Sequence, residues 1–460
     1  MQQPLLARPS FRSSVLGLTL GAVASMLPSA VLLGASAAAD APPSQAQAVF
    51  EATHLPPLLV AAGEQPKLTF DVHCAPAGIE DPEQPCAVTG SLFVRRGASA
   101  PFAESPLHVD ADHGLQRLTA SLPEGSDAAD LEYYAELETS GGVRLRVPAD
   151  GAAYHSYPLA DPIDVRASAP RVTAVRRGAR VAAASWGDGS NDVGLEQGRN
   201  VDPIGAASFD VDAAGSVVLL DEAHRRVLRW APGAVRPGRV PLSIDGRLAD
   251  MTLGDDGSLY VLESVALPGR RPLVRRFDDT GRELDAVEAG DVSPSQIRPG
   301  PDGPVALQQP SHLWMPVSSA GTPLSPREQR SRGRVGRLLR SGAEIVTYRT
   351  GNELRIAVIR NGRVRTSWRI TSPATLGEVQ LAEPLGNRMI VVLRTFDDAS
   401  DRFHVLVLDR HGVVRQFAVS PADWAEASPL SRFRVAGGRL YQLGSDPAGV
   451  FVDRYDLEVR

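Results

Sequence analysis

Short stretches in which apolar and polar residues alternate recur along the chain from residue 45 to its end. A period of two is typical of β-strands that bury one face, and the Gly, Pro, Asp and Ser residues between the stretches favour turns. Over residues 45–166 the expected strands include "KLTFDVHC", "VTGSLFVRR", "LQRLTASLP" and "LEYYAELET". Several short strands at this spacing predict an antiparallel β-sandwich.

Glycines mark a repeat over residues 172–460. One series precedes apolar strands at intervals of 39 to 52 residues, and consists of Gly215, Gly257, Gly303, Gly342, Gly386 and Gly438. A second series follows the next strand, at Gly281, Gly321, Gly362 and Gly412. Tight hairpins need a residue that tolerates positive φ, and a unit of roughly 40 to 50 residues is the size of a propeller blade. Six such units predict a six-bladed β-propeller.

The stretch "ARVAAASWG", Ala179 to Gly187, lies upstream of the first complete blade. If it pairs with the last blade, it closes the ring and ties the two ends of the domain together. The predicted fold is therefore all-β, with an N-terminal β-sandwich at 45–166 followed by a six-bladed propeller at 172–460.

The first 39 residues have the pattern of a secretory signal peptide. Arg8 and Arg12 precede a long apolar run that ends in small residues with Ala-x-Ala spacing, and cleavage is expected after Ala37 or Ala39. The alternative is a retained membrane anchor, since the run approaches the roughly 20 apolar residues of a span. The pattern favours cleavage and predicts a bacterial secreted protein, extracellular or in the periplasm or cell envelope, with no membrane span afterwards.

Cys74 and Cys86 are the only cysteines, and a Pro-rich stretch separates them. In an exported protein such a pair predicts a disulfide. Closing so short a loop would stabilise the fold by roughly 3 kcal/mol. A metal pair or a catalytic thiol is the weaker alternative, because His73 is the one histidine close enough in sequence to complete a ligand set.

The formal net charge of −6 argues against a nucleic-acid or anionic-membrane binder, which usually needs a basic balance. One segment opposes this trend: "REQRSRGRVGRLLR", Arg327 to Arg340, carries six arginines and one glutamate. The preferred interpretation is a solvated loop between the third and fourth blades. The alternative is a surface that grips an anionic polysaccharide or a phosphate-rich envelope polymer.

Residues 186–230 resemble an NHL repeat. The positions that match are Trp186, Gly187, Pro203, Gly205, Asp212, Gly215, Asp221, Arg226, Val227 and Trp230, while His224 stands where the family usually has asparagine. The second unit matches moderately, and the other four keep only turns and strands. The resemblance implies a six-bladed NHL-like propeller with mostly binding functions, although propellers of related shape include lactonases, a streptogramin lyase and a zinc-dependent amidating lyase.

The N-terminal strands carry a second resemblance. The segment "LEYYAELETSGGVRLRVP" is similar in pattern to the late hairpin of fibronectin type III or immunoglobulin-like modules of bacterial secreted proteins. This resemblance implies an interaction or spacer module at 45–166, and it assigns a function to no residue.

Candidate chemistry is sparse. In "IGAASFDVDAAGSVVLLDEAHRRVLRW" the acids Asp212 and Asp221 are expected to satisfy backbone groups at turns. Only His224 and Arg225 remain there as candidates for a contact surface. The sequence "DGSND" from Asp188 fails the calcium-loop pattern, because Val193 and Arg199 replace the required Gly and Glu.

The histidines of the expected propeller occupy different local positions in their blades and do not predict a shared metal site; they are His224, His312, His404 and His411. The sequence therefore predicts no catalytic residue, no metal ligand and no cofactor, although a divalent cation in the propeller channel stays possible. Trp186, Trp314 and Trp424 either stack on sugars or pack between blades.

Two functions follow. The favoured one is a secreted, monomeric, non-enzymatic binding or envelope-associated propeller that takes a protein or glycan ligand on a propeller face, with no nucleic-acid partner. The alternative is a propeller hydrolase or lyase, lactonase-like or streptogramin-lyase-like and assisted by a divalent metal. The central channel discriminates: convergent acids and histidines favour the enzyme, and an apolar or arginine-lined channel favours binding.

Overall fold

The protein is described from a computed structural model. It describes residues 49–75, 87–112, 115–124, 130–148, 153–159, 161–169, 173–198, 202–264, 271–290, 294–308, 313–397, 400–427 and 431–457. Residues 47–460 form one compact unit. The expected signal peptide at 1–39, Cys86 of the expected disulfide and His312 lie outside the described residues, so the leader and the Cys74–Cys86 bond stay predictions.

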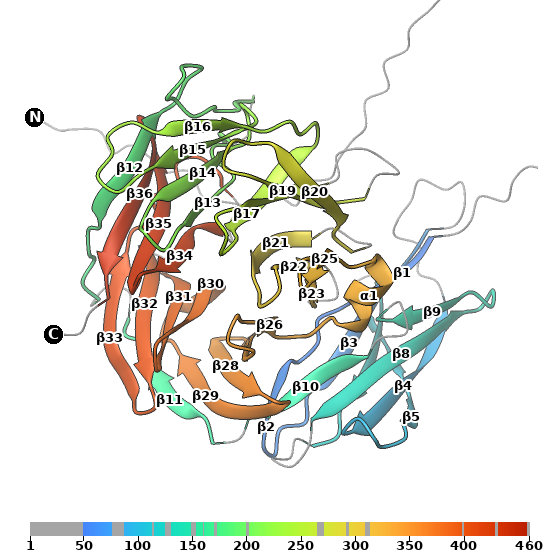
Figure 1. Cartoon of the computed structure of the whole chain (residues 1–460). Coiled ribbons are helices and arrows are strands. Elements are labelled where there is room, and N and C mark those ends of the chain that lie inside the picture. The colour runs from blue at the N-terminus through green and yellow to red at the C-terminus, as the bar shows by residue number, and fades with distance from the viewer. Residues whose placement is uncertain are drawn as a thin grey trace, which may run out of the picture. The chain divides into compact units, whose positions relative to one another are not determined.

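Two sheets at the N-terminal end form the β-sandwich (Figure 1). The first has the order β1 (Val49–His54), β3 (Lys67–Ala75), β7 (Leu115–Ser121) and β6 (His108–Asp112). The second has the order β2 (Leu59–Ala61), β10 (Tyr154–Leu159), β8 (Leu131–Thr139), β4 (Val88–Arg96) and β5 (Ala103–Pro106), with β9 (Arg144–Val147) paired to β8. Phe70, Leu92, Leu118 and Tyr133 form a buried core with side chains from both sheets.

Six further sheets surround a common axis (Figure 1). The first blade is β13 (Ser208–Val211), β14 (Val217–Asp221), β15 (Arg226–Trp230) and β16 (Gly238–Pro241). The second is β17 (Arg247–Leu253), β18 (Leu259–Ser264), β19 (Leu273–Phe277) and β20 (Glu283–Glu288). The third is β21 (Pro294–Pro299), β22 (Pro304–Gln308) and β23 (Trp314–Pro316), followed by the hairpin β24 (Ser318–Ser319) and β25 (Thr322–Pro323).

The remaining blades have four or five strands. The fourth is β26 (Arg337–Leu338), β27 (Glu344–Thr350), β28 (Glu353–Arg360) and β29 (Arg363–Thr371), with β11 (Ile163–Arg166) added parallel to β29. The fifth is β30 (Thr375–Leu385), β31 (Arg388–Asp397), β32 (Ser400–Asp409) and β33 (Gly412–Val419). The sixth is β34 (Phe433–Ala436), β35 (Arg439–Asp446), β36 (Gly449–Asp456) and β12 (Ala179–Ser185).

Pairing of β12 with β36 closes the ring. The two strands run antiparallel, with Ala183 opposite Phe451 and Ser185 opposite Gly449. The first strand of the sixth blade also contacts the first strand of the first blade. The expected closure by Ala179–Gly187, and with it the all-β fold of a sandwich followed by a six-bladed propeller, is confirmed.

The glycine series explains why the sequence repeats. Every glycine of the first series lies between the first and second strands of its blade, and all ten glycines of the two series have φ between 62° and 133°. An L-residue with a side chain rarely adopts this conformation. The period seen in the sequence is therefore the spacing of one equivalent hairpin in six blades.

The sandwich and the propeller share a hydrophobic core. Leu59 and Tyr157 of the sandwich belong to one buried cluster with Val346 and Ile359 of the fourth blade. The strand β11, expected at the end of the sandwich, instead extends that blade, so the expected sandwich range of 45–166 differs from the observed sheets at these four residues. This shared core fixes one side of the sandwich next to the fourth blade.

The described residues contain a single helix, α1 (Pro326–Ser331), which lies between the third and fourth blades. Ser325 begins it through a capping box: its hydroxyl accepts from the Glu328 N–H, and the Glu328 carboxylate accepts from the Ser325 N–H. Across the part of the chain that the structure describes, no helix is long and apolar enough to span a membrane.

Candidate functional site

Ion pairs join the inner strands of the propeller near its axis. Asp250 on β17 is fully buried, and its carboxylate lies 2.8 Å from Arg298 on β21 and 3.2 Å from Arg434 on β34. The hydroxyls of Ser208 and Ser431 donate to the same carboxylate at 2.5 and 2.6 Å. One acid thus joins inner strands of the first, second, third and sixth blades.

The charges at the axis compensate one another. Burial raises the pKa of Asp250, but the charges of Arg298 and Arg434 outweigh it and hold that pKa below its usual value. Burial, followed by the charge of Arg298, lowers the pKa of Arg434 to about 10. Arg337 on β26 pairs with Glu383 on β30 at 2.6 Å, which links the fourth and fifth blades in the same way. These ion pairs hold the blades together.

This axis offers little for metal chemistry. Within the described ranges, no three His, Cys, Asp or Glu side chains lie close enough to hold a metal ion together. His404 is buried on β32 with Nδ1 3.3 Å from the Gln416 amide, and His411 lies in the exposed turn before β33. The inner strands bring acids to the axis, but each is matched by arginine.

Asp221, in the acidic stretch at 204–230, binds nearby groups of the protein itself. Asp221 is fully buried, accepts from the Gly194 N–H at 3.1 Å, and contacts His224 and Arg226, each at 2.8 Å. Arg226 also donates to the Ser190 carbonyl at 3.2 Å. These contacts fix the "DGSND" loop against the first blade, as a scaffold would.

The two expected contact residues differ in exposure. His224 is about one-fifth exposed and engaged with Asp221, whereas the Arg225 side chain is half-exposed and donates to the Ile244 carbonyl. Arg225 has φ of 51°, so the turn presents this side chain from a left-handed position. The contact surface itself stays a prediction, and Arg225 is its more accessible member.

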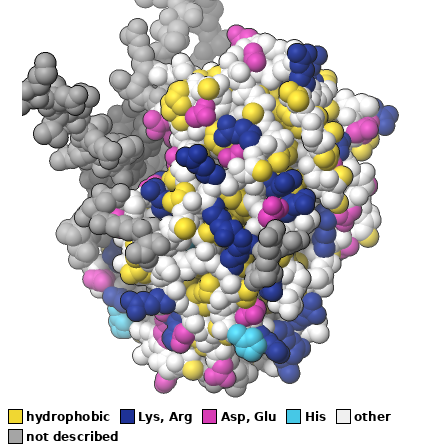
Figure 2. Space-filling view, turned by 90° about the vertical axis from the view of Figure 1, so that its left-hand side faces the viewer, with side chains coloured by type: hydrophobic (Ala, Val, Ile, Leu, Met, Phe, Trp, Pro, Cys, Tyr) yellow, Lys and Arg dark blue, Asp and Glu magenta, His cyan; other side chains and the backbone are white. Residues whose placement is uncertain are grey.

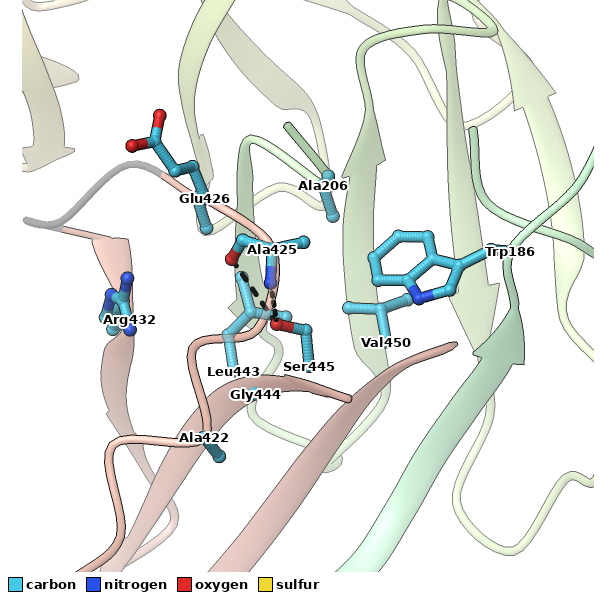
Figure 3. Close-up of a pocket in the computed structure, with 12 residues that line it drawn as sticks. Trp186, Ala206, Ala422, Ala425, Glu426, Arg432, Leu443, Gly444, Ser445 and Val450 are labelled. Atoms are coloured by element: carbon cyan, nitrogen blue, oxygen red, sulfur yellow. Dashed lines mark hydrogen bonds between the residues drawn. The ribbon is translucent and has the colours of Figure 1, made fainter. Parts of the chain in front are cut away.

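Trp186 packs where the sixth blade meets the first (Figure 3). Its indole N–H donates to the Asp446 carbonyl at 2.9 Å, and its ring centroid lies 6.0 Å from that of Trp424. Beside it, the Ser445 hydroxyl accepts from the Ala425 N–H at 2.8 Å. The cavity among these residues has a volume of about 10 Å³. That space holds one water molecule, so this pocket is too small for a ligand.

A second pocket, of about 330 Å³, lies at the first and second blades and is lined by Glu222, Arg247 and Glu426 among others. Burial raises the pKa of Glu222, and the neighbouring charge of Glu196 adds to that rise while Arg247 opposes it. A carboxyl group with a raised pKa in a pocket is a candidate general acid or base.

The largest of these depressions, about 840 Å³, is a cleft between the sandwich and the segment that carries α1. We call it the arginine cleft. Six arginines and one glutamate line it: Arg95, Arg146, Arg327, Arg330, Arg332, Arg334 and Glu132. Tyr157 and Phe102 add aromatic surface. Six positive charges therefore converge in a protein whose formal net charge is −6.

Each wall of the cleft is fixed by contacts of its own. On the sandwich wall, Arg95 donates to Glu132 at 2.8 Å and its guanidinium lies 4.5 Å from the centroid of Phe102. On the propeller wall, the N–H groups of Trp314 and Arg334 donate to each other's carbonyls at 2.7 and 3.0 Å. The Arg95 side chain and the backbone of Arg334 are thus held in place by contacts within the protein.

Beneath the propeller wall, Glu344 is buried 3.3 Å from Arg334. Burial raises the pKa of Glu344, although Arg334 opposes the rise. Arg327 and Arg332 are exposed and line the cleft, so their charges are accessible at its surface.

Another face of the protein shows what an ordinary surface looks like here. On the side that carries β12, β33 and β36, basic side chains are scattered among acidic, apolar and uncharged ones (Figure 2). Arg180 of β12 pairs with Asp453 of β36 at 3.1 Å, and Arg439 of the neighbouring strand β35 pairs with Asp456 of β36 at 3.2 Å. The cleft differs because its arginines outnumber its acids.

The sequence located only half of this cleft. The arginine run at 327–340 does lie between the third and fourth blades, as expected, but it forms α1 and a cleft wall and is more than a solvated loop. Arg95 and Arg146 were missed, because they lie on two separate sandwich strands and nothing in the local pattern connects either one to residue 327. The only sequence signal for Arg95 and Arg146 is a basic residue at an outward-facing position of a strand that lies close to an aromatic residue.

The fold defines the class: a six-bladed β-propeller preceded by a β-sandwich, with a basic cleft between them. No protein-family model and no curated protein matches the sequence, so membership of the NHL family stays a prediction.

Solved structures similar to this chain include hydrazine synthase from Kuenenia stuttgartiensis, with 15% identity, 55% of this chain and 81% of that chain covered, and a TM-score of 0.34. Virginiamycin B lyase from Staphylococcus aureus has 13% identity, coverages of 56% and 97%, and a TM-score of 0.33. The PQQ-bound aldose sugar dehydrogenase from Streptomyces coelicolor has 10% identity, coverages of 61% and 97%, and a TM-score of 0.33. These sequence identities and TM-scores are too low to assign a function to this chain.

Proposed function

We propose that the protein is an exported, non-catalytic binding protein that takes an anionic ligand in the arginine cleft. The observation that carries this proposal is the convergence of six arginines, from the sandwich and from the α1 segment, on one depression of about 840 Å³ with a single glutamate in its lining. A planar guanidinium matches carboxylate, sulfate and phosphate oxygens two at a time.

The excess of positive charge in the cleft favours a ligand-binding role over a role in solubility alone. Clustered like charges repel one another and raise the free energy of the folded protein. Outside the cleft, Arg180 and Arg439 each pair with an aspartate, whereas the arginines that line the cleft outnumber the acids there. An anionic ligand adds negative charge beside the exposed side chains of Arg327 and Arg332, which stabilises its binding.

Direct binding measurements test the proposal. Titration calorimetry with polygalacturonate, dextran sulfate and polyphosphate covers the three anionic chemistries. We expect the R327A/R332A variant to lose at least about tenfold in affinity, because each charge-assisted hydrogen bond contributes about 1.5 to 3 kcal/mol. Binding should also weaken as salt is raised.

The matched control is Arg239→Ala, an exposed arginine on β16 of the first blade. It should bind each probe as the unchanged protein does. If none of the three probes binds, or if R327A/R332A binds as tightly as R239A, the proposal is wrong.

Export belongs to the same proposal. The N-terminal pattern at 1–39 supports it, and so does the cysteine pair, which would form its disulfide in an oxidising compartment. Expression of the full chain in a bacterium, followed by fractionation and N-terminal sequencing, tests it. A mature N-terminus after Ala37 or Ala39 is expected, and an uncleaved cytosolic protein would contradict it.

A propeller hydrolase or lyase is the second candidate, favoured by one observation. Glu222, with its raised pKa, lines a pocket of about 330 Å³ together with Glu426. Such a carboxyl can donate a proton to a leaving group. Screening lactone and glycan substrates with the unchanged protein and with Glu222→Gln tests this: activity that disappears in the variant favours the enzyme.

A further inference from the structure

Resting on the proposed anion binding, we propose that the ligand is an extended acidic polysaccharide whose chain runs from the arginine cleft into a second depression beside Trp314. This inference names the ligand class, which the charge of the cleft alone leaves open. It is carried by the placement of an aromatic side chain, two arginines and several hydroxyl groups at one junction.

The second depression adjoins the cleft. It has a volume of about 280 Å³, and Ser331, Arg332 and Arg334 line it as well as the arginine cleft. The two depressions are therefore separate lobes on either side of one short segment of chain. A small anion fills part of one lobe, whereas a ligand that uses both must be extended.

Backbone pairing sets Trp314 beside Arg334. The two residues are directly opposite in an antiparallel bridge. Directly opposite residues place their side chains on the same face of the pair. Trp314 is partly exposed and both residues line the second depression, so an aromatic ring and a guanidinium face the same space.

These groups fit an acidic sugar. The flat, apolar C–H face of a pyranose ring packs on an indole, and the uronate carboxylate of the same ring accepts two hydrogen bonds from a guanidinium. Ser319, Ser331 and Asp302 also line the second depression. Serine hydroxyls and an aspartate in this lining exchange hydrogen bonds with the many neutral hydroxyl groups of a sugar chain, which a polyphosphate lacks, and this favours a polysaccharide.

Chain-length dependence is the measurement that tests this. Galacturonate oligomers of increasing length, titrated by calorimetry, should bind more tightly until both lobes are filled and then level off. Trp314→Ala should reduce the affinity for the long oligomers by about tenfold and leave the affinity for the shortest binding oligomer unchanged. Trp314→Phe should restore part of the loss.

Trp424→Ala is the matched control, because Trp424 is 38% exposed but lies in the loop before the sixth blade, away from both lobes. It should bind oligomers of every length as the unchanged protein does. Near-ultraviolet circular dichroism and thermal unfolding check that Trp314→Ala is folded. If Trp314→Ala does not fold, the affinity of Trp314→Phe for the long oligomers is measured in its place.

The outcomes separate this inference from the proposed function. Affinity that does not depend on oligomer length, or a folded Trp314→Ala variant that binds long oligomers as tightly as Trp424→Ala does, overturns the inference. If the protein binds dextran sulfate or polyphosphate but not galacturonate oligomers, this inference is wrong, while the proposed anion binding stands. Tighter binding of single-stranded oligonucleotides overturns it in favour of nucleic acid. Absence of binding to every anion overturns both proposals.

Discussion

The carboxylate of Asp250 on β17 lies 3.2 Å from the guanidinium of Arg434 on β34, although 184 residues separate them in the chain. The two strands belong to the second and the sixth blades, so the contact spans the axis beside the first blade. Arg298 of the third blade shares the same carboxylate. The chain thus uses buried charge to join blades that are distant in sequence.

Asp250→Ala should destabilise the protein by about 3 to 5 kcal/mol. The substitution leaves the guanidiniums of Arg298 and Arg434 buried without their shared acid, and an uncompensated buried charge carries a penalty of that size. Urea unfolding at neutral pH measures the effect. Asp245→Ala is the control, because its side chain is fully exposed and should change stability by less than about 0.5 kcal/mol. Equal midpoints for the two variants would contradict the prediction.

Gly257→Ala tests the hairpin that repeats in every blade. Gly257 has φ of 81°, and a Cβ atom there would meet no other atom within 4 Å. The expected loss of about 1 to 2 kcal/mol is therefore backbone strain alone. Gly281→Ala should cost more, because its φ of 86° brings the same strain and its Cβ would overlap the carbonyl oxygen of Pro241. Thermal unfolding ranks the two, and the reverse order would be evidence against this account.

The blades were predictable because each depends on local sequence. A turn such as that at Gly257 lies between two strands that are neighbours in the chain, so spacing alone reveals it. The closing strand β12 was predictable because a ring needs a partner for its last blade. The strand β11 follows the sandwich in the sequence, but its four residues pair with a strand about 200 residues later, which no local pattern predicts.

The sites were less predictable because they depend on contacts between distant segments. Asp250 stands in "RLADMTL" as one polar residue at an inner-strand position, and nothing nearby indicates Arg298 or Arg434 as its partners. The run at 327–340 was visible as charge, but its role required Arg95 and Arg146 on the opposite wall. Sequence patterns report neighbours along the chain, and a cleft is made by neighbours in space.

Acid should weaken the fold through His404. This side chain is fully buried on β32, and burial lowers its pKa from 6.5 to about 4. In the unfolded chain it takes up a proton below pH 6.5, whereas in the folded protein it stays neutral down to about pH 4. Its contribution is therefore complete above pH 6.5 and is lost progressively between pH 6.5 and 4.

The expected loss through His404 is about 1 to 2 kcal/mol at pH 5. Urea unfolding of the unchanged protein and of His404→Leu, at pH 7 and at pH 5, measures it. The variant should lose less stability on acidification, since it has no imidazole to protonate. His411→Leu is the control, because His411 is exposed. An equal acid response in both variants would exclude His404 as the source.

Arg355 should couple the sandwich to the propeller. From β28 it donates to the Leu59 carbonyl of the sandwich at 2.9 Å and to Glu64 at 2.5 Å, and it is also held by Glu353 at 2.6 Å. Arg355→Ala leaves the Leu59 carbonyl and Glu64 without this donor at a buried junction. We expect a loss of about 1 to 3 kcal/mol and, because the shared core loosens, an unfolding transition of the sandwich that separates from that of the propeller.

Calorimetric unfolding distinguishes one transition from two, and anion titration reports whether the arginine cleft survives. Its sandwich wall carries Arg95 and Arg146, so a sandwich that is less firmly fixed should bind the polyanion more weakly even though every cleft arginine is present. Arg363→Ala, an exposed residue on the adjacent strand β29, is the control and should keep one transition and full affinity. A single transition with unchanged affinity in Arg355→Ala would show that the hydrophobic cluster alone holds the junction.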